Sequence, residues 1–192
     1  MIIEKPANDS IPGEKENTEP GFKTELRYLI VIVIFGCLIN LLMLGAMTLW
    51  DTDEALYAQI AREMAESGDY ITTQWNGGTW FCHPPLYFWL VALAAKFFGW
   101  TEFAARFPSA LFGILLMVLV YYFGKLMVNS RTGFYAALIT GATIQLWVQS
   151  RMALLDMPFL FFLIAAVYFF YLGFQKGDSR YYRSEERRVG KE

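Results

Sequence analysis

Residues 50–86 read WDTDEALYAQIAREMAESGDYITTQWNGGTWFCHPPL, and this polar stretch between apolar segments decides how the chain is organised. It carries six acidic residues against one basic residue, Arg62, and holds the only histidine of the chain, His83. The carboxylates of Asp53 and Glu54 follow a long apolar segment, where moving charge out of water is costly. A function explains such a pair better than stability does, so we expect the chemistry of the chain here.

The composition is that of a membrane protein. Of the 192 residues, 56% are hydrophobic and 18% aromatic, and the mean hydropathy is +0.34. The formal net charge is −2 and the body of the chain has no cluster of Lys and Arg, so no nucleic-acid partner is expected. Cys37 lies in an apolar run and Cys82 in the polar stretch, so we expect them at different depths and not in a disulfide.

Four apolar segments are predicted to be transmembrane helices, because crossing about 30 Å of hydrocarbon takes roughly 20 residues. They cover residues 26–50, 107–127, 133–148 and 157–174. A fifth apolar run, residues 86–98, is shorter and suits a juxtamembrane or re-entrant helix better than a span. The predicted fold class is an all-α polytopic membrane protein with amphipathic helices in a large first external loop.

Basic residues near the ends of the spans predict the topology. Lys23 and Arg27 flank the first span, so its start is expected in the cytoplasm. Lys125 and Arg131 fall on the same side only if residues 86–98 do not cross. The acidic stretch then lies on the opposite side, which predicts a multi-pass protein of the inner (plasma) membrane with its site on the periplasmic or external face.

The acidic stretch has two predicted parts. Residues 51–68 show apolar residues at helical spacing and Gly68 as a stop, which predicts an amphipathic helix too polar to span and lying at the membrane surface. Residues 70–81 contain β-branched residues and Asn76-Gly77-Gly78, a pattern typical of a small hairpin. Pro84 and Pro85 then end any regular structure before the next helix.

Each candidate residue of the site has more than one explanation. The pair Asp53 and Glu54 could take a proton from a hydroxyl nucleophile, bind a divalent cation, or cap a helix. His83 could donate to a phosphate, bind a metal, or be an interfacial residue without a role. Two arginines on the external side suit a phosphate headgroup, but snorkelling arginines and an Arg-Asp pair near a helix end are the alternatives. The two arginines are Arg106 and Arg151, and the aspartate of the alternative Arg-Asp pair is Asp156.

Four motifs in this order resemble a known family. They are DEALYAQIAREM (53–64), HPPLYFWL (83–90), EFAARFPSALFG (102–113) and RMALLDMPFLFF (151–162). Together they resemble the N-terminal part of the dolichyl-phosphate-mannose protein mannosyltransferase superfamily. Within it, the chain is most similar to the bacterial branch that includes the aminoarabinose transferase of lipid A.

The resemblance implies an inverting membrane glycosyltransferase. Such an enzyme moves a sugar from a polyprenyl-phosphate carrier to a lipid, glycan or protein acceptor on the non-cytoplasmic face. Asp53 matches an essential aspartate of the first loop, with Glu54 beside it, and is the candidate general base. His83 matches a position near the donor phosphate or a divalent metal ion. Substrate or phosphate binding is expected from Tyr57, His83, Arg106, Arg151 and Asp156.

The chain departs from the aminoarabinose branch at one place. That branch has Glu-Lys before the prolines, whereas this chain has Cys82 and His83. The departure argues against aminoarabinose as the sugar and against a metal ligand at position 82.

The expected organisation is that of a fragment. Residues 1–22 form a disordered cytoplasmic tail, and residues 23–176 the N-terminal part of a transmembrane glycosyltransferase domain. Residues 177–192 form a charged tail whose end resembles vector-derived sequence. Two other classes stay open: a transporter, which would carry ionisable residues in broken spans near the midplane, and a non-catalytic scaffold subunit, which would need neither Asp53 nor His83.

Overall fold

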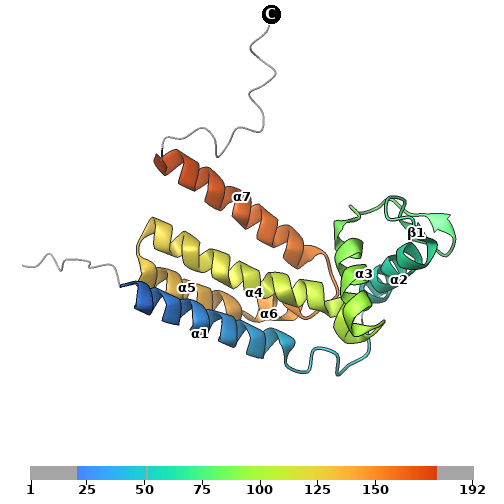
Figure 1. Cartoon of the computed structure of the whole chain (residues 1–192), viewed down its shortest axis with the longest axis horizontal. Coiled ribbons are helices and arrows are strands. Elements are labelled where there is room, and N and C mark those ends of the chain that lie inside the picture. The colour runs from blue at the N-terminus through green and yellow to red at the C-terminus, as the bar shows by residue number, and fades with distance from the viewer. Residues whose placement is uncertain (1–20, 51, 177–192) are drawn as a thin grey trace, which may run out of the picture.

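A computed structural model describes residues 21–50 and 52–176, and this part of the chain is mostly helical (Figure 1). The elements in order are α1 (Phe22–Leu41), α2 (Thr52–Ser67), β1 (Gln74–Trp75), β2 (Gly78–Thr79), α3 (Leu86–Phe98), α4 (Glu102–Met127), α5 (Ser130–Ala142), α6 (Ile144–Ser150) and α7 (Asp156–Lys176). The predicted tails, except residues 21 and 22, lie outside the described residues.

Helix α4 is the centre of a bundle of apolar helices (Figure 1). It packs against α1, α5 and α7 along its length, and its buried face carries Phe112, Leu116, Met117 and Tyr121. At the α4–α5 crossing, a Cβ on Gly124 would lie 2.7 Å from the Cα of Gly133. The two backbones therefore approach closely because both residues are glycines, as is common where membrane helices cross.

Within residues 21–50 and 52–176, three helices are long and apolar enough to cross a membrane: Phe22–Leu41, Glu102–Met127 and Asp156–Gln175. The prediction that the first helix continues to Trp50 is wrong, since α1 ends at Leu41 and Met43 has a positive φ of 56°. The physical reason lies in two distant arginines. Arg151 donates to the carbonyls of Ile39 and Leu42, and Arg106 donates to those of residues 44, 47 and 48. These carbonyls therefore accept hydrogen bonds from arginine side chains where a longer α1 would have used them within the helix.

The predicted span 133–148 is not one helix. Helix α5 ends at Ala142, Thr143 is extended with ψ 120°, and α6 starts at Ile144. The two pieces still run from one end of the bundle to the other, because Ser130 bonds Glu25 near the start of α1 and Ser150 bonds Asn40 near its end. Alone, α5 is too short to span, so a count of four crossings stays a prediction.

A small layer of α2, the hairpin and α3 lies beyond one end of the bundle (Figure 1). The predicted surface helix, hairpin and short apolar helix are confirmed as elements. Asn76 and Gly77 have φ values of 52° and 75°, the pair of positive angles that a tight two-residue hairpin turn needs. Helices α2 and α3 pack through Tyr57, Ile60 and Met64 against Phe88 and Val91.

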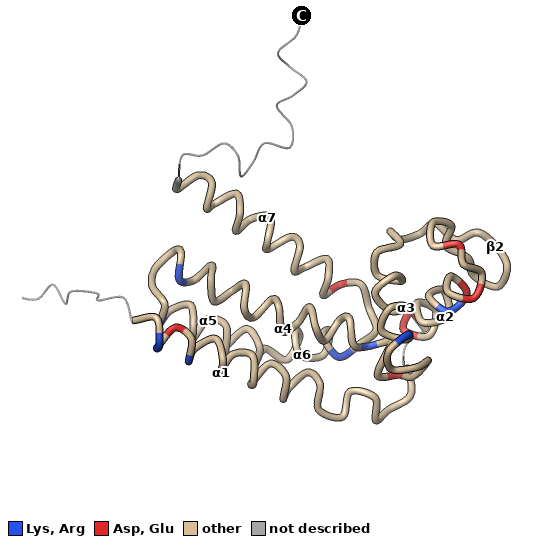
Figure 2. Tube along the Cα trace, in the orientation of Figure 1, with Lys and Arg blue, Asp and Glu red and all other residues tan. Residues whose placement is uncertain are grey.

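Charge separates along the described part of the molecule. Figure 2 shows most Asp and Glu residues on the layer of α2 and the hairpin, and Lys and Arg at the far end of the bundle as well as at its junction with the layer. The far end includes Lys125, which pairs with Glu25. Because the side of a membrane that a loop faces is set by Lys and Arg more than by acidic residues, the non-cytoplasmic location of the acidic layer stays a prediction.

Candidate functional site

The junction between bundle and layer is built on a buried ion pair. Glu54, in the first turn of α2, is 0% exposed, and Arg106, in the second turn of α4, is 7% exposed. Their contact is bidentate: Arg106 Nε donates to Oε1 and Nη2 to Oε2, both at 2.9 Å. A buried carboxylate is tolerated when its partner is this close and its remaining lone pairs are used.

Those lone pairs are used by the backbone. The N–H of Trp50 donates to Glu54 Oε2 at 2.9 Å, and the N–H of Ala153 donates to Oε1 at 2.6 Å. Burial alone would raise the pKa of Glu54, but the hydrogen bonds from Arg106, Ala153 and Trp50 outweigh it and hold that pKa below its ordinary value. Glu54 is therefore an ionised carboxylate with every acceptor position occupied.

The pair also fixes the loop after α1. Arg106 Nη1 donates to the carbonyls of Leu44 at 3.2 Å and Met47 at 2.8 Å, and its Nη2 to that of Thr48 at 3.0 Å. One carboxylate and one guanidinium thus tie together four segments: residues 44–50, the start of α2, α4, and the linker after α6.

Asp53 differs from its neighbour. It lies in the first turn of α2 but is exposed, so its carboxylate meets solvent. Asp53 and Tyr57 are four residues apart on one helix, which places them on the same face. Of the two predicted catalytic carboxylates, Asp53 is the one with a free approach for a substrate.

Tyr57 connects that face to His83. The Tyr57 hydroxyl lies 3.0 Å from His83 Nε2, and Tyr57 itself is buried. The imidazole also packs edge-on against the rings of Tyr57 and Trp80, with centroid distances of 5.5 and 5.3 Å. His83 is half-buried, so the aromatic rings orient it while one side stays accessible.

An apolar cavity of about 160 Å³ opens beside this histidine, between the start of α3 and the start of α7. Its lining residues are Pro84, Leu86, Tyr87, Leu155, Pro158, Phe159 and Phe162. Asp156, the first residue of α7, is exposed next to this lining and accepts a long hydrogen bond of 3.5 Å from Gln149. None of Asp53, Tyr57, His83 and Asp156 lines this groove itself. His83 and Asp156 are next in the chain to lining residues, and the Tyr57 ring packs against that of Tyr87, with 6.1 Å between the ring centroids.

Arg151 belongs to a different cavity, of about 280 Å³, between the loop after α1 and α6. No residue lines both cavities. The ion pairs of the described residues are Arg62–Glu66, Arg106–Glu54 and Lys125–Glu25, so the alternative of an Arg151–Asp156 pair is not what the described part of the chain forms. The predicted phosphate-binding residues thus divide between two places.

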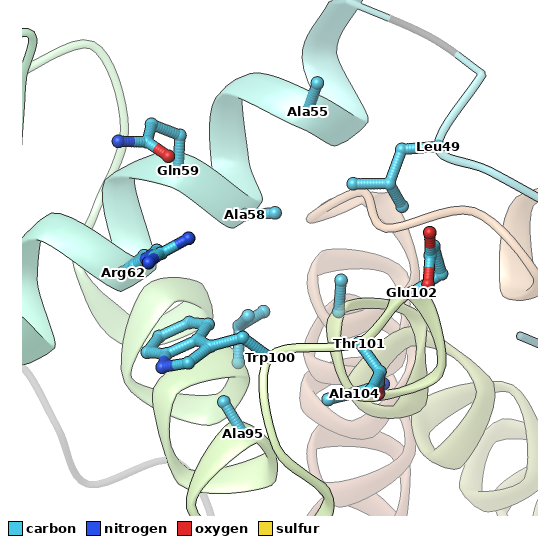
Figure 3. A pocket seen from close by; sticks show the side chains of 12 residues that line it. Leu49, Ala55, Ala58, Gln59, Arg62, Ala95, Trp100, Thr101, Glu102 and Ala104 are labelled. Atoms are coloured by element: carbon cyan, nitrogen blue, oxygen red, sulfur yellow. The ribbon is translucent and has the colours of Figure 1, made fainter.

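A third cavity, of about 250 Å³, contains none of the predicted site residues. Figure 3 shows it between α2, α3 and the start of α4, with Gln59, Arg62 and Trp100 on one side and Glu102 on the other. Its α2 residues, Ala55 and Ala58 among them, lie away from the face of Tyr57.

The described residues do not fit a metal site. Within residues 21–50 and 52–176, no group of three or more His, Cys, Asp or Glu side chains gathers where it could hold a metal ion. The Nε2 of His83 faces a tyrosine hydroxyl and not a carboxylate. No step of the chemistry below passes through a metal.

Sequence reasoning missed some residues of the site. Ser109 is buried, lies 3.2 Å from the Tyr87 hydroxyl, and donates to the carbonyl of Leu154 at 2.6 Å. It fixes the linker that also carries Ala153, and a serine in an apolar helix gives no local signal of such a contact. Trp80, which orients His83, was likewise not singled out.

Known proteins are similar to this chain over about three quarters of its length. The family model described as dolichyl-phosphate-mannose-protein mannosyltransferase matches residues 82–184. An undecaprenyl phosphate-alpha-4-amino-4-deoxy-L-arabinose arabinosyl transferase of Yersinia enterocolitica is 34% identical over 143 residues, which are 74% of this chain and 26% of that protein.

Two crystal structures of ArnT from Cupriavidus metallidurans share the fold at 25% identity. The apo structure has a TM-score of 0.70 and covers 76% of this chain and 27% of that one. The structure bound to undecaprenyl phosphate has a TM-score of 0.67 and covers 78% and 27%. The chain therefore spans about a quarter of the length of these relatives. Because the family model matches more than half of its 192 residues, the chain belongs to the dolichyl-phosphate-mannose-protein mannosyltransferase family.

Proposed function

We propose that the chain is part of a membrane glycosyltransferase that moves a sugar from a polyprenyl-phosphate carrier to a lipid, glycan or protein acceptor at the non-cytoplasmic face of the inner membrane. The family and the names of the relatives support the reaction class, and one relative binds undecaprenyl phosphate. The observation that carries the proposal is the contrast between two adjacent carboxylates: Glu54 is buried with its acceptor positions filled, and Asp53 is exposed beside it.

The donor fits the groove between α3 and α7. Its lining is apolar and begins beside His83, so the first isoprene units can lie along Leu155, Phe159 and Phe162 while the phosphate stays at the histidine. The Tyr57 hydroxyl and Nε2 of His83 share one hydrogen bond, which fixes the orientation of the imidazole, so Nδ1 is the ring nitrogen that can donate to a phosphate oxygen. In this proposal His83 binds the donor phosphate, Tyr57 orients His83, and Asp156 lies next in the chain to the groove residue Leu155.

Asp53 is the proposed general base. The acceptor hydroxyl or amine gives its proton to Asp53 as its oxygen or nitrogen bonds to the anomeric carbon, and the bond from that carbon to the phosphate oxygen breaks. Polyprenyl phosphate leaves with the electron pair, and its new charge is met by the Nδ1–H donor of His83, which Tyr57 holds in place. One displacement from the face opposite the phosphate inverts the anomeric configuration.

Glu54 and Arg106 act in this proposal as positioning residues. The ion pair holds the first turn of α2 against α4 and the linker after α6, so it fixes where Asp53 and the edge of the groove lie. Arg106 donates its hydrogen bonds to Glu54 and to the backbone carbonyls of residues 44, 47 and 48. For this reason it is not proposed to bind the phosphate of the sugar carrier.

The proposed topology has four crossings: α1, α4, the broken pair α5–α6, and α7. Both chain ends then lie in the cytoplasm, and α3 lies along the external interface. A transporter would place ionisable residues at the helix break, but residues 140–146 contain none.

The test is a pair of isosteric variants of α2. Asp53→Asn should lower the release of polyprenyl phosphate from a polyprenyl-phosphate-linked sugar by at least about a hundredfold, since general acid–base groups contribute roughly 10²–10⁴. Glu66→Gln removes the same charge from an exposed position of the same helix and should change the rate little. Equal rates for wild type and Asp53→Asn, in membranes that contain equal amounts of protein, would exclude Asp53 as the base.

A further inference from the structure

Arg151 is a half-buried cation whose hydrogen bonds use one nitrogen. Its Nη1 donates to the carbonyls of Ile39 at 2.9 Å, Asn40 at 3.3 Å and Leu42 at 2.9 Å. Ile39 and Asn40 lie in the last turn of α1, and Leu42 is the residue that follows the helix. A guanidinium carries five N–H donors. All three hydrogen bonds from Arg151 to the described residues use Nη1. The Nε and Nη2 side of the guanidinium can therefore donate to a ligand.

No carboxylate of the described residues neutralises this cation. The nearest candidate in its cavity is Glu54, which is already bound by Arg106 and two backbone amides. Arg106 lines the same cavity and adds a second positive charge. Burial first, and then the charge of Arg106, lower the pKa of Arg151, because both disfavour its charged form.

The cavity around Arg151 is amphipathic. Its other lining side chains are Met43, Leu44, Met47, Thr48, Trp50, Trp147, Val148 and Met152, and its volume is about 280 Å³. Several of them are exposed: Met43 by 71%, Met47 by 62% and Trp147 by 43%. The Arg151 guanidinium stacks over the Trp147 ring, 5.4 Å from its centroid, so the charge lies directly beside an apolar wall.

The cavity also lies at a defined depth of the molecule. Its lining residues come from the loop after α1, the start of α2, α4 and α6. These segments meet at the junction of bundle and layer (Figure 1), which in the proposed topology lies at the level of the lipid headgroups. A ligand that suits it has an anionic head for Arg151 and an apolar part for the methionines and Trp147.

We propose that the cavity between the loop after α1 and α6 is a binding site for an anionic phospholipid, with a phosphate oxygen accepting hydrogen bonds from Nε and Nη2 of Arg151. The acyl chains leave along Trp147 and Val148 on α6. A bound phosphate supplies the negative charge that the cavity lacks and leaves the Nη1 contacts to the end of α1 in place. The lipid then also stabilises the end of α1 where it breaks before the layer.

Lipid binding at this cavity can be measured apart from glycosyl transfer, although Glu54 and Arg106, which position Asp53, also line the cavity. It shares no lining residue with the groove beside His83, so loss of the donor site would not empty it. Its test is therefore a binding measurement that needs no sugar donor.

Native mass spectrometry of the purified chain in detergent can count bound lipids. The probes are phosphatidylglycerol, phosphatidylcholine, undecaprenyl phosphate and inorganic phosphate, each added separately. Wild type should retain one phosphatidylglycerol more tightly than phosphatidylcholine, and Arg151→Gln should weaken that binding by about tenfold or more, as expected for a lost charge-assisted hydrogen bond. Arg62→Gln removes the same charge from an exposed helix surface and should bind like wild type.

A second variant keeps the arginine. Val148→Trp fills the cavity wall and should weaken phosphatidylglycerol binding while circular dichroism shows the helix content of wild type, so a folding defect of Arg151→Gln cannot decide the result. Equal binding by wild type and both variants would overturn the proposal. So would displacement of the lipid by millimolar inorganic phosphate alone, equal binding of phosphatidylcholine, or a cavity that retains undecaprenyl phosphate and no phosphatidylglycerol.

Discussion

Two neighbouring residues show how burial decides chemical role. Asp53 and Glu54 follow each other in one turn of α2, yet one carboxylate meets solvent and the other accepts hydrogen bonds from three residues. A carboxylate needs a free lone pair to take a proton, so the exposed one suits catalysis and the buried one suits support. The sequence alone could not make this distinction because the partner of Glu54 is 52 residues away.

Removal of one partner of the buried pair should be more harmful than removal of both. Glu54→Ala leaves the Arg106 guanidinium buried without a counter-charge and should cost about 3–5 kcal/mol of stability. Replacing both, as Glu54→Leu with Arg106→Met, should restore a large part of that loss. Thermal unfolding in detergent measures both variants, and a double variant less stable than Glu54→Ala would show that the pair itself provides the stability.

The pair also predicts a pH dependence. The folded-state pKa of Glu54 is lowered from its ordinary value of 4.5, so its contribution to stability is fully present above that value and is lost as the pH falls through the lower, folded-state pKa. The difference in unfolding temperature between wild type and Glu54→Gln should therefore shrink as the pH falls below about 4.5. A difference that stays constant down to pH 3 would mean that Glu54 does not titrate in this window.

At the scale of helices, local signals predicted the elements better than their ends. The helix over α2, its stop at Gly68 and the hairpin turn at Asn76-Gly77 follow from capping and turn chemistry within a few residues. The end of α1 at Leu41 and the break at Thr143 do not. The first depends on carbonyls that bind Arg106 and Arg151, which are distant in sequence, so a hydrophobicity pattern cannot reveal it.

In the site too, local sequence signals predicted some features, and contacts between distant residues determine the others. Tyr57 and His83, both expected to bind the substrate or its phosphate, do lie within 3.0 Å of each other, while the side of the membrane on which they lie stays a prediction. The use of Arg106 as a partner of Glu54, and the separation of Arg151 from the groove beside His83, depend on side-chain directions that only the fold determines.

The broken pair α5–α6 depends on close packing against α4. A Cβ on Gly113 would lie 2.7 Å from the Cβ of Ser150, at the point where α4 meets the end of α6. Gly113→Ala should therefore destabilise the bundle by about 1–3 kcal/mol through overpacking. Gly21→Ala, at a position with open space, is the matched control and should be neutral. Equal unfolding temperatures for both variants would mean that α6 can move away from α4 at little cost.

The whole molecule joins an apolar bundle to a compact acidic layer (Figures 1 and 2). The bundle leaves large apolar side chains of α1 and α7 exposed, among them Ile34, Leu38, Phe159 and Phe170, as expected for helices that face lipid or further helices. The proposed donor groove and the Arg151 cavity both open where layer and bundle meet. A lipid-linked sugar can reach that level from the bilayer, and an acceptor can reach it from the aqueous side.

The proposed function requires the layer with Asp53 to lie on the side of the membrane away from the cytoplasm, where the sugar is transferred. The most direct measurement is labelling of Asp53→Cys with a membrane-impermeant maleimide in intact cells, in a chain whose Cys37 and Cys82 are replaced by serine. Arg131→Cys in the same background is the control for the opposite side. Position 53 should be labelled in intact cells, and position 131 only after the membrane is permeabilised. The reverse pattern would show that the layer with Asp53 faces the cytoplasm.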